Sequence, residues 1–140
     1  MVTARFLLDR DALSECLKGS PHRPFAARLG QHRFSLAIAA TTWQEALFGL
    51  GLMPRGKRRD VIEEALIKVI EPSVDVLPYD KEAAAWHGRE RARLQLAGKV
   101  APYADGEIAA VAVRNDLTLV TNNVRHFKAF RDLRVVNWMR

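Results

Sequence analysis

The chain has 140 residues, of which 49% are hydrophobic and 27% are charged. This balance is ordinary for one globular domain, and it excludes a disordered tail, a fibrous repeat or several substantial domains. The 22 lysines and arginines outnumber the 16 aspartates and glutamates, which gives a formal net charge of +6. We therefore treat residues 1–140 as a single domain that favours an anionic partner, nucleic acid first and an acidic protein segment second.

Cysteine content and hydropathy limit where the protein works. The longest stretch without a charged residue, 34–44, is far shorter than the roughly 20 apolar residues that a membrane-spanning helix needs. Arg5 and Asp9 interrupt the apolar N-terminal patch, so no signal-peptide core is predicted. Cys16 is the only cysteine, which excludes an internal disulfide and a thiolate zinc cluster within one chain. We expect a cytoplasmic protein without a membrane segment.

Hydrophobic periodicity predicts buried strands alternating with amphipathic helices along the whole chain. In the first half we expect a strand at 4–8, a helix at 12–17 capped by Asp11, a helix at 25–29, a strand at 34–38 and a helix at 43–50. In the second half we expect a helix at 61–70 ended by Pro72, a strand at 74–77, helices at 81–97 and 104–113, and strands at 117–120 and 134–136. This order predicts a three-layer α/β/α fold with a central, mainly parallel sheet of four to five strands.

Acidic residues stand near the ends of the predicted strands, where parallel sheets carry their functional sites. Asp9 follows the first strand, Glu45 lies in the first turn of the helix after the second strand, and Asp105 opens the helix before the fourth. Three carboxylates in one cleft raise one another's pKa or require a cation. Oxygen ligands select Mg²⁺ or Mn²⁺ over zinc, and Mg²⁺ bound by carboxylates and substrate phosphates supports phosphodiester hydrolysis.

Each of these acids also has a structural interpretation. Thr42 stands three residues before Glu45, which is the spacing of a capping box. Asp105 in a first helical turn is favoured by the helix dipole, and Asp9 with Asp11 fits an Asx turn and a helix cap. Both interpretations stay open for each acid alone, whereas three acids at one sheet edge favour a metal site.

Four segments of the chain carry a family pattern. They are FLLD at 6–9, TTWQEALFG at 41–49, YADGEIAA at 103–110 and LVTNNVRHF at 119–127. Their order and spacing resemble the successive motifs of VapC-type toxins, which are PIN-domain ribonucleases. The resemblance extends from the first strand to Asn137 and Trp138.

The resemblance implies an Mg²⁺-dependent endoribonuclease, with Mn²⁺ as a substitute, that acts as the toxin of a type II toxin–antitoxin pair. Asp9 and Asp105 would hold the metal, and Glu45 would complete the cluster through a water or by orienting the attacking water. The metal would lower the pKa of that water and stabilise charge on the phosphate oxygens. The implied partners are an RNA substrate, a second copy in a homodimer and a VapB-like antitoxin that blocks the cleft.

The chain departs from the family pattern after the fourth strand, where family members place a fourth acid and this chain has Asn123 and His126. We expect Asn123 to act in the catalytic site as a neutral ligand of water or phosphate, and we expect one well-occupied metal. The alternative is a catalytically impaired PIN-like module that binds RNA or another protein. A nucleotide-binding domain is disfavoured, because no glycine-rich phosphate loop follows the first strand.

Two basic clusters, 55–59 and 125–134, are candidate phosphate contacts, although charge runs are usually solvated faces. The apolar helices around 43–53 and 61–70 are candidates for the dimer interface or for the antitoxin groove.

Overall fold

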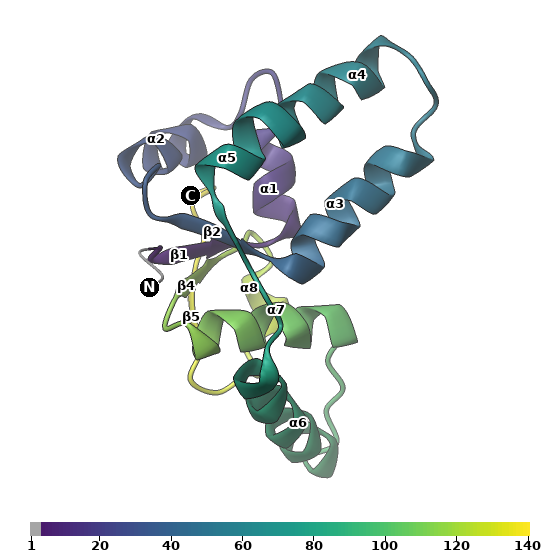
Figure 1. The fold of residues 1–140 in the computed structure, drawn as a ribbon. Helices are drawn as coiled ribbons and strands as arrows, with labels where there is room; N and C mark the ends of the chain where they lie inside the picture. Colours follow the sequence, from purple (N-terminus) through teal and green to yellow (C-terminus); the bar gives the residue numbers. More distant parts are fainter. Residues whose placement is uncertain (1–3) are drawn as a thin grey trace.

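A parallel sheet forms the centre of the computed structural model, which describes residues 4–140 (Figure 1). Its strands are β1 (Phe6–Leu8), β2 (Leu36–Ala39), β3 (Asp75–Leu77), β4 (Thr118–Val120) and β5 (Arg134–Val136). They form a five-stranded sheet in the order β3-β2-β1-β4-β5, and every neighbouring pair is parallel. The predicted three-layer α/β fold with a mainly parallel sheet is confirmed.

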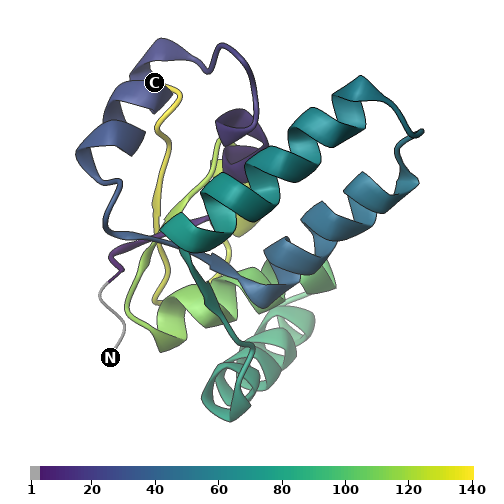
Figure 2. The same cartoon turned by 45° about the horizontal axis from the view of Figure 1, so that its top comes forward.

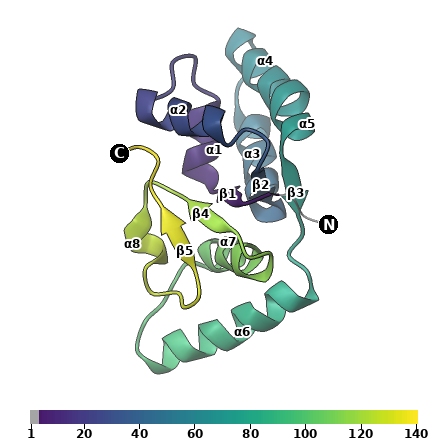
Figure 3. The ribbon, with the colours of Figure 1, turned by 90° about the vertical axis from the view of Figure 1, so that its left-hand side faces the viewer.

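Helices cover both faces of the sheet, as Figures 2 and 3 show. One layer contains α1 (Arg10–Cys16), α2 (Arg23–Gln31), α3 (Ala40–Leu52) and a long helix made of α4 (Lys57–Glu64), the π-helical stretch η1 (Ala65–Ile70) and α5 (Glu71–Ser73). The other layer contains α6 (Lys81–Leu96) and α7 (Tyr103–Arg114), and the short α8 (Val124–Phe127) lies beside β5. No helix within residues 4–140 has the length and apolar character that crossing a membrane requires.

The alternation of side chains along each strand divides the core into two clusters. Leu7 and Leu119 point toward α6 and α7 and pack with Ile108. Leu8 and Val120, one residue further along, point to the opposite face and pack among the side chains of α1 to α4. These four side chains, Leu7, Leu8, Leu119 and Val120, are each at most 1% exposed. A register shift of one residue would move each of them to the opposite face of the sheet, and such a shift is therefore strongly disfavoured.

The C-terminal segment is held by aromatic packing against α2 and β1. The Trp138 ring stacks on His32 with centroids 5.4 Å apart, and it lies 5.0 Å from the Phe6 ring. Trp138 is 3% exposed, so this contact anchors the end of the chain near α2, where Figure 1 shows the C-terminus.

The helix that precedes β3 ends at Ser73, one residue after the predicted stop at Pro72. The helix continues from α4 through η1 into α5, and Pro72 is the second residue of α5. Pro72 has no N–H to continue the helical hydrogen bonds, which fits the end of the helix one residue later. The short helix α8 was not predicted, since four residues are too few to show a helical period.

The order of the strands creates a switch point beside β1. The chain passes from β1 to β2 and β3 on one side, and then returns to form β4 and β5 on the other. In open parallel sheets the loops at such a point diverge at the carboxyl ends of the strands and leave a crevice. Asp9 follows β1 and Asn123 follows β4, so both flank this crevice.

Candidate active site

Asp9 leaves the sheet at the end of β1 and caps the helix that follows. Its backbone is extended, and its Oδ1 accepts a hydrogen bond of 2.8 Å from the backbone N–H of Ala12. The prediction that Asp11 caps this helix is therefore wrong. The chain turns into the helix one step earlier than the sequence pattern indicates, at the first residue after the strand, which leaves Asp11 inside the first turn.

The Asp9 carboxylate is 4% exposed, and this burial is the main reason that its pKa rises to about 6. The charges of Asp11 and Asp105 raise the pKa further, whereas hydrogen bonds from Thr121 and Ala12 lower it. A bound cation would stabilise the ionised form of such a carboxylate, which is buried and lies near two others.

Glu45 and Asp105 approach Asp9 from two different helices. Asp105 lies in the first turn of α7, and burial raises its pKa, opposed by His126. Glu45 lies in the second turn of α3, where burial is again the largest cause of a raised pKa, the Arg10 charge lowers it and the Asp105 charge raises it. The pKa of each of the three proposed ligands is thus raised by partial burial and by the charge of neighbouring acids.

The capping-box interpretation of Thr42 and Glu45 is wrong. Helix α3 begins at Ala40 and has no side-chain cap, so Thr42 is already inside the helix and Glu45 lies beyond its first turn. The Thr42 hydroxyl is buried and makes no hydrogen bond within residues 4–140. Helix capping therefore does not determine the position of Glu45.

Asn123 and His126 complete the cleft from the β4 side. The Asn123 side-chain amide donates to the Asp11 carboxylate, and its backbone N–H donates to the Thr121 hydroxyl at 2.9 Å. His126 places its Nδ1 3.9 Å from an Asp105 oxygen. The two residues at the positions of the absent fourth acid thus contact two carboxylates of the cleft.

A cleft of about 190 Å³ collects these side chains at the carboxyl edge of the sheet. Its lining includes the four predicted site residues, which come from the ends of two strands and from two helices: Asp9, Glu45, Asp105 and Asn123. Asp11 and His126 also line it. The structure therefore brings together every residue that the sequence analysis assigned to the site.

Sequence reasoning missed two residues of this site. Arg10 lines the cleft beside Glu45, and the Thr121 hydroxyl bonds Asp9. Thr121 is the first residue after β4, and β4 pairs with β1 so that Val120 lies opposite Leu8. That pairing is the signal that would have found Thr121, but it requires the strand order.

The residues of the cleft suit a hard divalent cation. Its donors are carboxylate and amide oxygens, and the three acids have raised pKa values. Within residues 4–140 no three Asp, Glu, His or Cys side chains stand close enough to share one ion as arranged here. Mg²⁺ usually takes one or two protein carboxylates and fills its remaining positions with waters, so two direct ligands are sufficient.

Comparison with known proteins matches this site to a family. The PIN domain family profile matches residues 6–133, which includes Asp9, Glu45, Asp105 and Asn123. The chain belongs to the PIN-domain family. Among curated relatives, this PIN domain is 34% identical to the VapC ribonuclease Y4jK of Sinorhizobium fredii. The alignment spans 126 residues, which are 88% of this chain and 90% of the relative. It is 30% identical to the tRNA(fMet)-specific endonuclease VapC of Salmonella typhimurium, over 96% of this chain and 98% of the relative.

Solved structures agree with this VapC-type PIN assignment. A chain of the FitAB complex bound to a DNA fragment superposes with a TM-score of 0.87 at 30% identity, over 96% of each chain. VapC in the DNA-bound VapBC complex of Salmonella typhimurium gives a TM-score of 0.84 at 27% identity, over 96% of this chain and 98% of that chain. The same arrangement of strands and helices is thus found in two toxin complexes.

Proposed function

We propose that this VapC-type PIN domain is a divalent-metal-dependent endoribonuclease and the toxin of a type II toxin–antitoxin pair. The observation that carries the proposal is the convergence of Asp9, Glu45 and Asp105 on one cleft. Relatives named VapC ribonuclease and tRNA(fMet)-specific endonuclease, matched over most of the chain, support RNA as the substrate.

In this proposal Asp9 and Asp105 would hold Mg²⁺ or Mn²⁺, and Glu45 would complete the site through a water. The ion would supply positive charge for the phosphate oxygens. Glu45, with its raised pKa, accepts the proton of the attacking water, and the nearby charge of Arg10 favours its ionised form. Asn123 is fixed by Asp11 and binds the water or a phosphate oxygen as a neutral group.

The proposed protein partner is a VapB-like antitoxin that blocks the cleft, because similar chains were solved in FitAB and VapBC complexes. We also propose a homodimer that buries apolar side chains of α3 and α4. Phe48, Leu52 and Val61 are 65%, 70% and 59% exposed. Light scattering of the purified protein tests the dimer. A lone cysteine and an RNA substrate fit the cytoplasm, where we place the protein.

The decisive experiment is cleavage of a mixed RNA pool by antitoxin-free protein with Mg²⁺ or Mn²⁺. Asp9→Asn and Asp105→Asn remove one carboxylate charge each and should abolish cutting, as should EDTA. Asp116→Asn is the matched control, because Asp116 is 88% exposed at the opposite edge of the sheet, paired with Arg134. If the wild type binds RNA and never cuts it, the protein is an RNA-binding module instead.

A further inference from the structure

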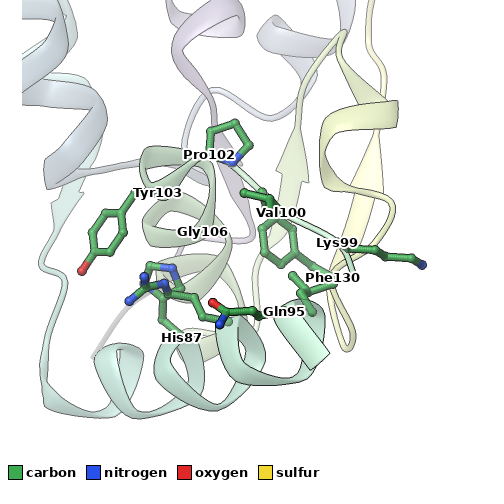
Figure 4. Close-up of a pocket in the computed structure, with 11 residues that line it drawn as sticks. His87, Gln95, Lys99, Val100, Pro102, Tyr103, Gly106 and Phe130 are labelled. Atoms are coloured by element: carbon green, nitrogen blue, oxygen red, sulfur yellow. The ribbon is translucent and has the colours of Figure 1, made fainter. Parts of the chain in front are cut away.

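Two further hollows lie beside the active-site cleft along the segment that joins α6 to α7, and together they are called the groove here. His126 lines both the cleft and a second hollow of about 420 Å³, which also contains Arg125 and Lys99. This second hollow shares Lys99, Val100 and Pro102 with a third hollow of about 140 Å³ (Figure 4). The cleft and the second hollow thus share His126, and the second and third hollows share the 99–102 segment, so the three hollows follow one another from α8 to the α6–α7 segment.

The charge of this groove is opposite to that of the cleft. Arg125, Lys99 and Arg91 line the second and third hollows, and no aspartate or glutamate of residues 4–140 does. None of these three cations has an ion pair with a carboxylate in the described part of the chain, whereas Arg93 and Arg134 are paired with Glu90 and Asp116. Unpaired cations beside a phosphodiester-cleaving site are suited to bind the flanking phosphates.

The groove also presents flat and apolar surface between its cations. Val100 is 94% exposed and Tyr103 is 53% exposed, and the Arg91 guanidinium lies 4.9 Å from the Tyr103 ring centroid. Figure 4 shows Tyr103 and Lys99 at opposite ends of the third hollow. Aromatic rings and guanidinium planes stack unpaired nucleobases, so this alternation of charge and apolar surface fits a single strand better than a duplex.

We propose that single-stranded RNA leaves the cleft across α8 and lies along the α6–α7 segment. Arg125 and Lys99 bind phosphates on one side of the scissile phosphate, and Tyr103 with Arg91 receives a base. This inference rests on the proposed nuclease function, and it adds the direction of the strand and the residues that hold it. An acidic peptide is the competing occupant, and the Tyr103 ring with the Arg91 guanidinium favours RNA, because these flat groups can stack on a nucleobase.

The basic cluster at 55–59, also a candidate phosphate contact from the sequence, shares no hollow with the active-site cleft or the groove and provides a matched control. Lys57 and Arg58 are exposed at the start of α4 and line a separate hollow with Val61 and Ile62, which contains none of the cleft residues. Lys57→Ala/Arg58→Ala therefore removes the same charge as Lys99→Ala/Arg125→Ala, away from the groove. All four side chains are exposed, so both double variants should fold with unchanged melting temperatures, and the single Gln variants Lys99→Gln and Arg125→Gln provide a milder second test.

The test measures binding of a labelled single-stranded RNA in EDTA by fluorescence anisotropy at several salt concentrations, and cleavage with Mn²⁺. Losing two phosphate contacts should weaken binding by about tenfold or more and reduce the slope of log K against log salt by about 1.4. KM should rise in Lys99→Ala/Arg125→Ala while kcat changes by less than about twofold, because ground-state binding is what is lost. Lys57→Ala/Arg58→Ala should match the wild type.

The outcomes separate this inference from the proposed function. If the wild type does not cut RNA, the nuclease function fails. If the wild type cuts RNA and the two double variants have the same affinity and salt dependence, the groove does not carry the strand. If Lys99→Ala/Arg125→Ala retains RNA binding and loses only the antitoxin, the groove binds an acidic protein segment and the inference is overturned.

Discussion

The imidazole ring of His87 lies directly against Gly106, in the space that a side chain at position 106 would occupy. His87 belongs to α6, is 1% exposed, and has its Nδ1 2.7 Å from the Tyr79 hydroxyl oxygen. Burial lowers the pKa of His87, which keeps the ring neutral in this contact. Figure 4 shows His87 of α6 beside Gly106 of α7. Because Gly106 follows Asp105, this contact sets how closely the first turn of α7, which carries Asp105, approaches α6.

Gly106→Ala is expected to destabilise the protein and impair the site. The added Cβ would overlap the ring atoms of His87, so helix and ring must separate, at a cost of about 1–3 kcal/mol. Because α7 moves with Asp105, RNA cleavage should fall more than the folded fraction does. Urea unfolding and cleavage rates at 25 °C measure the two effects.

Gly88→Ala is the control for this prediction. Gly88 neighbours His87 in α6 but has nothing within 4 Å of an added Cβ, so alanine should stabilise the helix by about 0.5–1 kcal/mol. Equal effects of the two substitutions would show that the His87 ring does not constrain position 106.

Hydrophobic pattern and motif order were sufficient to predict the strands, their parallel arrangement and the three layers. The strand at 134–136 was predicted to the residue, and it contains the β-branched pair Val135 and Val136. Element ends were less predictable, since they depend on tertiary contacts. Asp9 rather than Asp11 caps α1, because the paired strand β1 ends at Leu8 and the chain turns there.

The membership of the candidate site could be predicted, but its electrostatics could not. The family motifs name Asp9, Glu45 and Asp105, and the structure places them in one cleft. Their raised pKa values depend on burial, which no local sequence pattern encodes. The bond from Asn123 to Asp11 joins residues far apart in the sequence and requires the pairing of β1 with β4.

Glu90→Gln should destabilise the protein at neutral pH. Glu90 is 6% exposed and accepts hydrogen bonds from the Arg93 Nε at 2.7 Å and from the Arg131 backbone N–H at 2.5 Å, which tie α6 to the segment after α8. Weakening these charge-assisted bonds should cost about 1.5–3 kcal/mol. Urea unfolding at pH 7 measures the difference, with Glu82→Gln as control, because Glu82 is 60% exposed and 3.9 Å from Arg114.

The same pair of variants should show a pH dependence. The Arg93 guanidinium and the Arg131 N–H hold the pKa of Glu90 below its ordinary value of 4.5. A depressed carboxyl pKa contributes stability that is present above 4.5 and lost as the pH falls through the folded-state pKa. The difference between the wild type and Glu90→Gln should therefore shrink below pH 4.5, and a difference that stays constant down to pH 3 would contradict this assignment.

Asp9→Asn should stabilise the metal-free protein at pH 7 and above. Asparagine can still cap the helix, as Asp9 does. The substitution also removes a buried carboxyl group whose pKa is raised from 3.8 to about 6. A raised carboxyl pKa favours the folded state at low pH, and that advantage is lost as the pH rises from 3.8 through 6. The variant should gain about 2–3 kcal/mol above pH 7 and nothing below pH 4.

This gain is measured by urea unfolding in EDTA at pH 4, 6 and 8. Asp116→Asn serves as control, since Asp116 is exposed and its positive φ of 55° suits asparagine. A loss of stability in Asp9→Asn at pH 8 would mean that the ionised carboxylate is already well compensated in the metal-free protein.

Metal binding should weaken sharply in the pH range where Asp9 takes up its proton. A divalent cation competes with that proton, so the affinity for Mn²⁺ should be level above pH 7 and fall about tenfold per pH unit below pH 6. Titration calorimetry with Mn²⁺ between pH 5 and 8 measures this profile. Asp9→Asn should bind weakly at every pH and lose the dependence, whereas Asp116→Asn should reproduce the wild-type curve. A wild-type affinity that does not change between pH 5 and 8 would remove Asp9 from the metal site and leave Glu45 and Asp105 as the ligands.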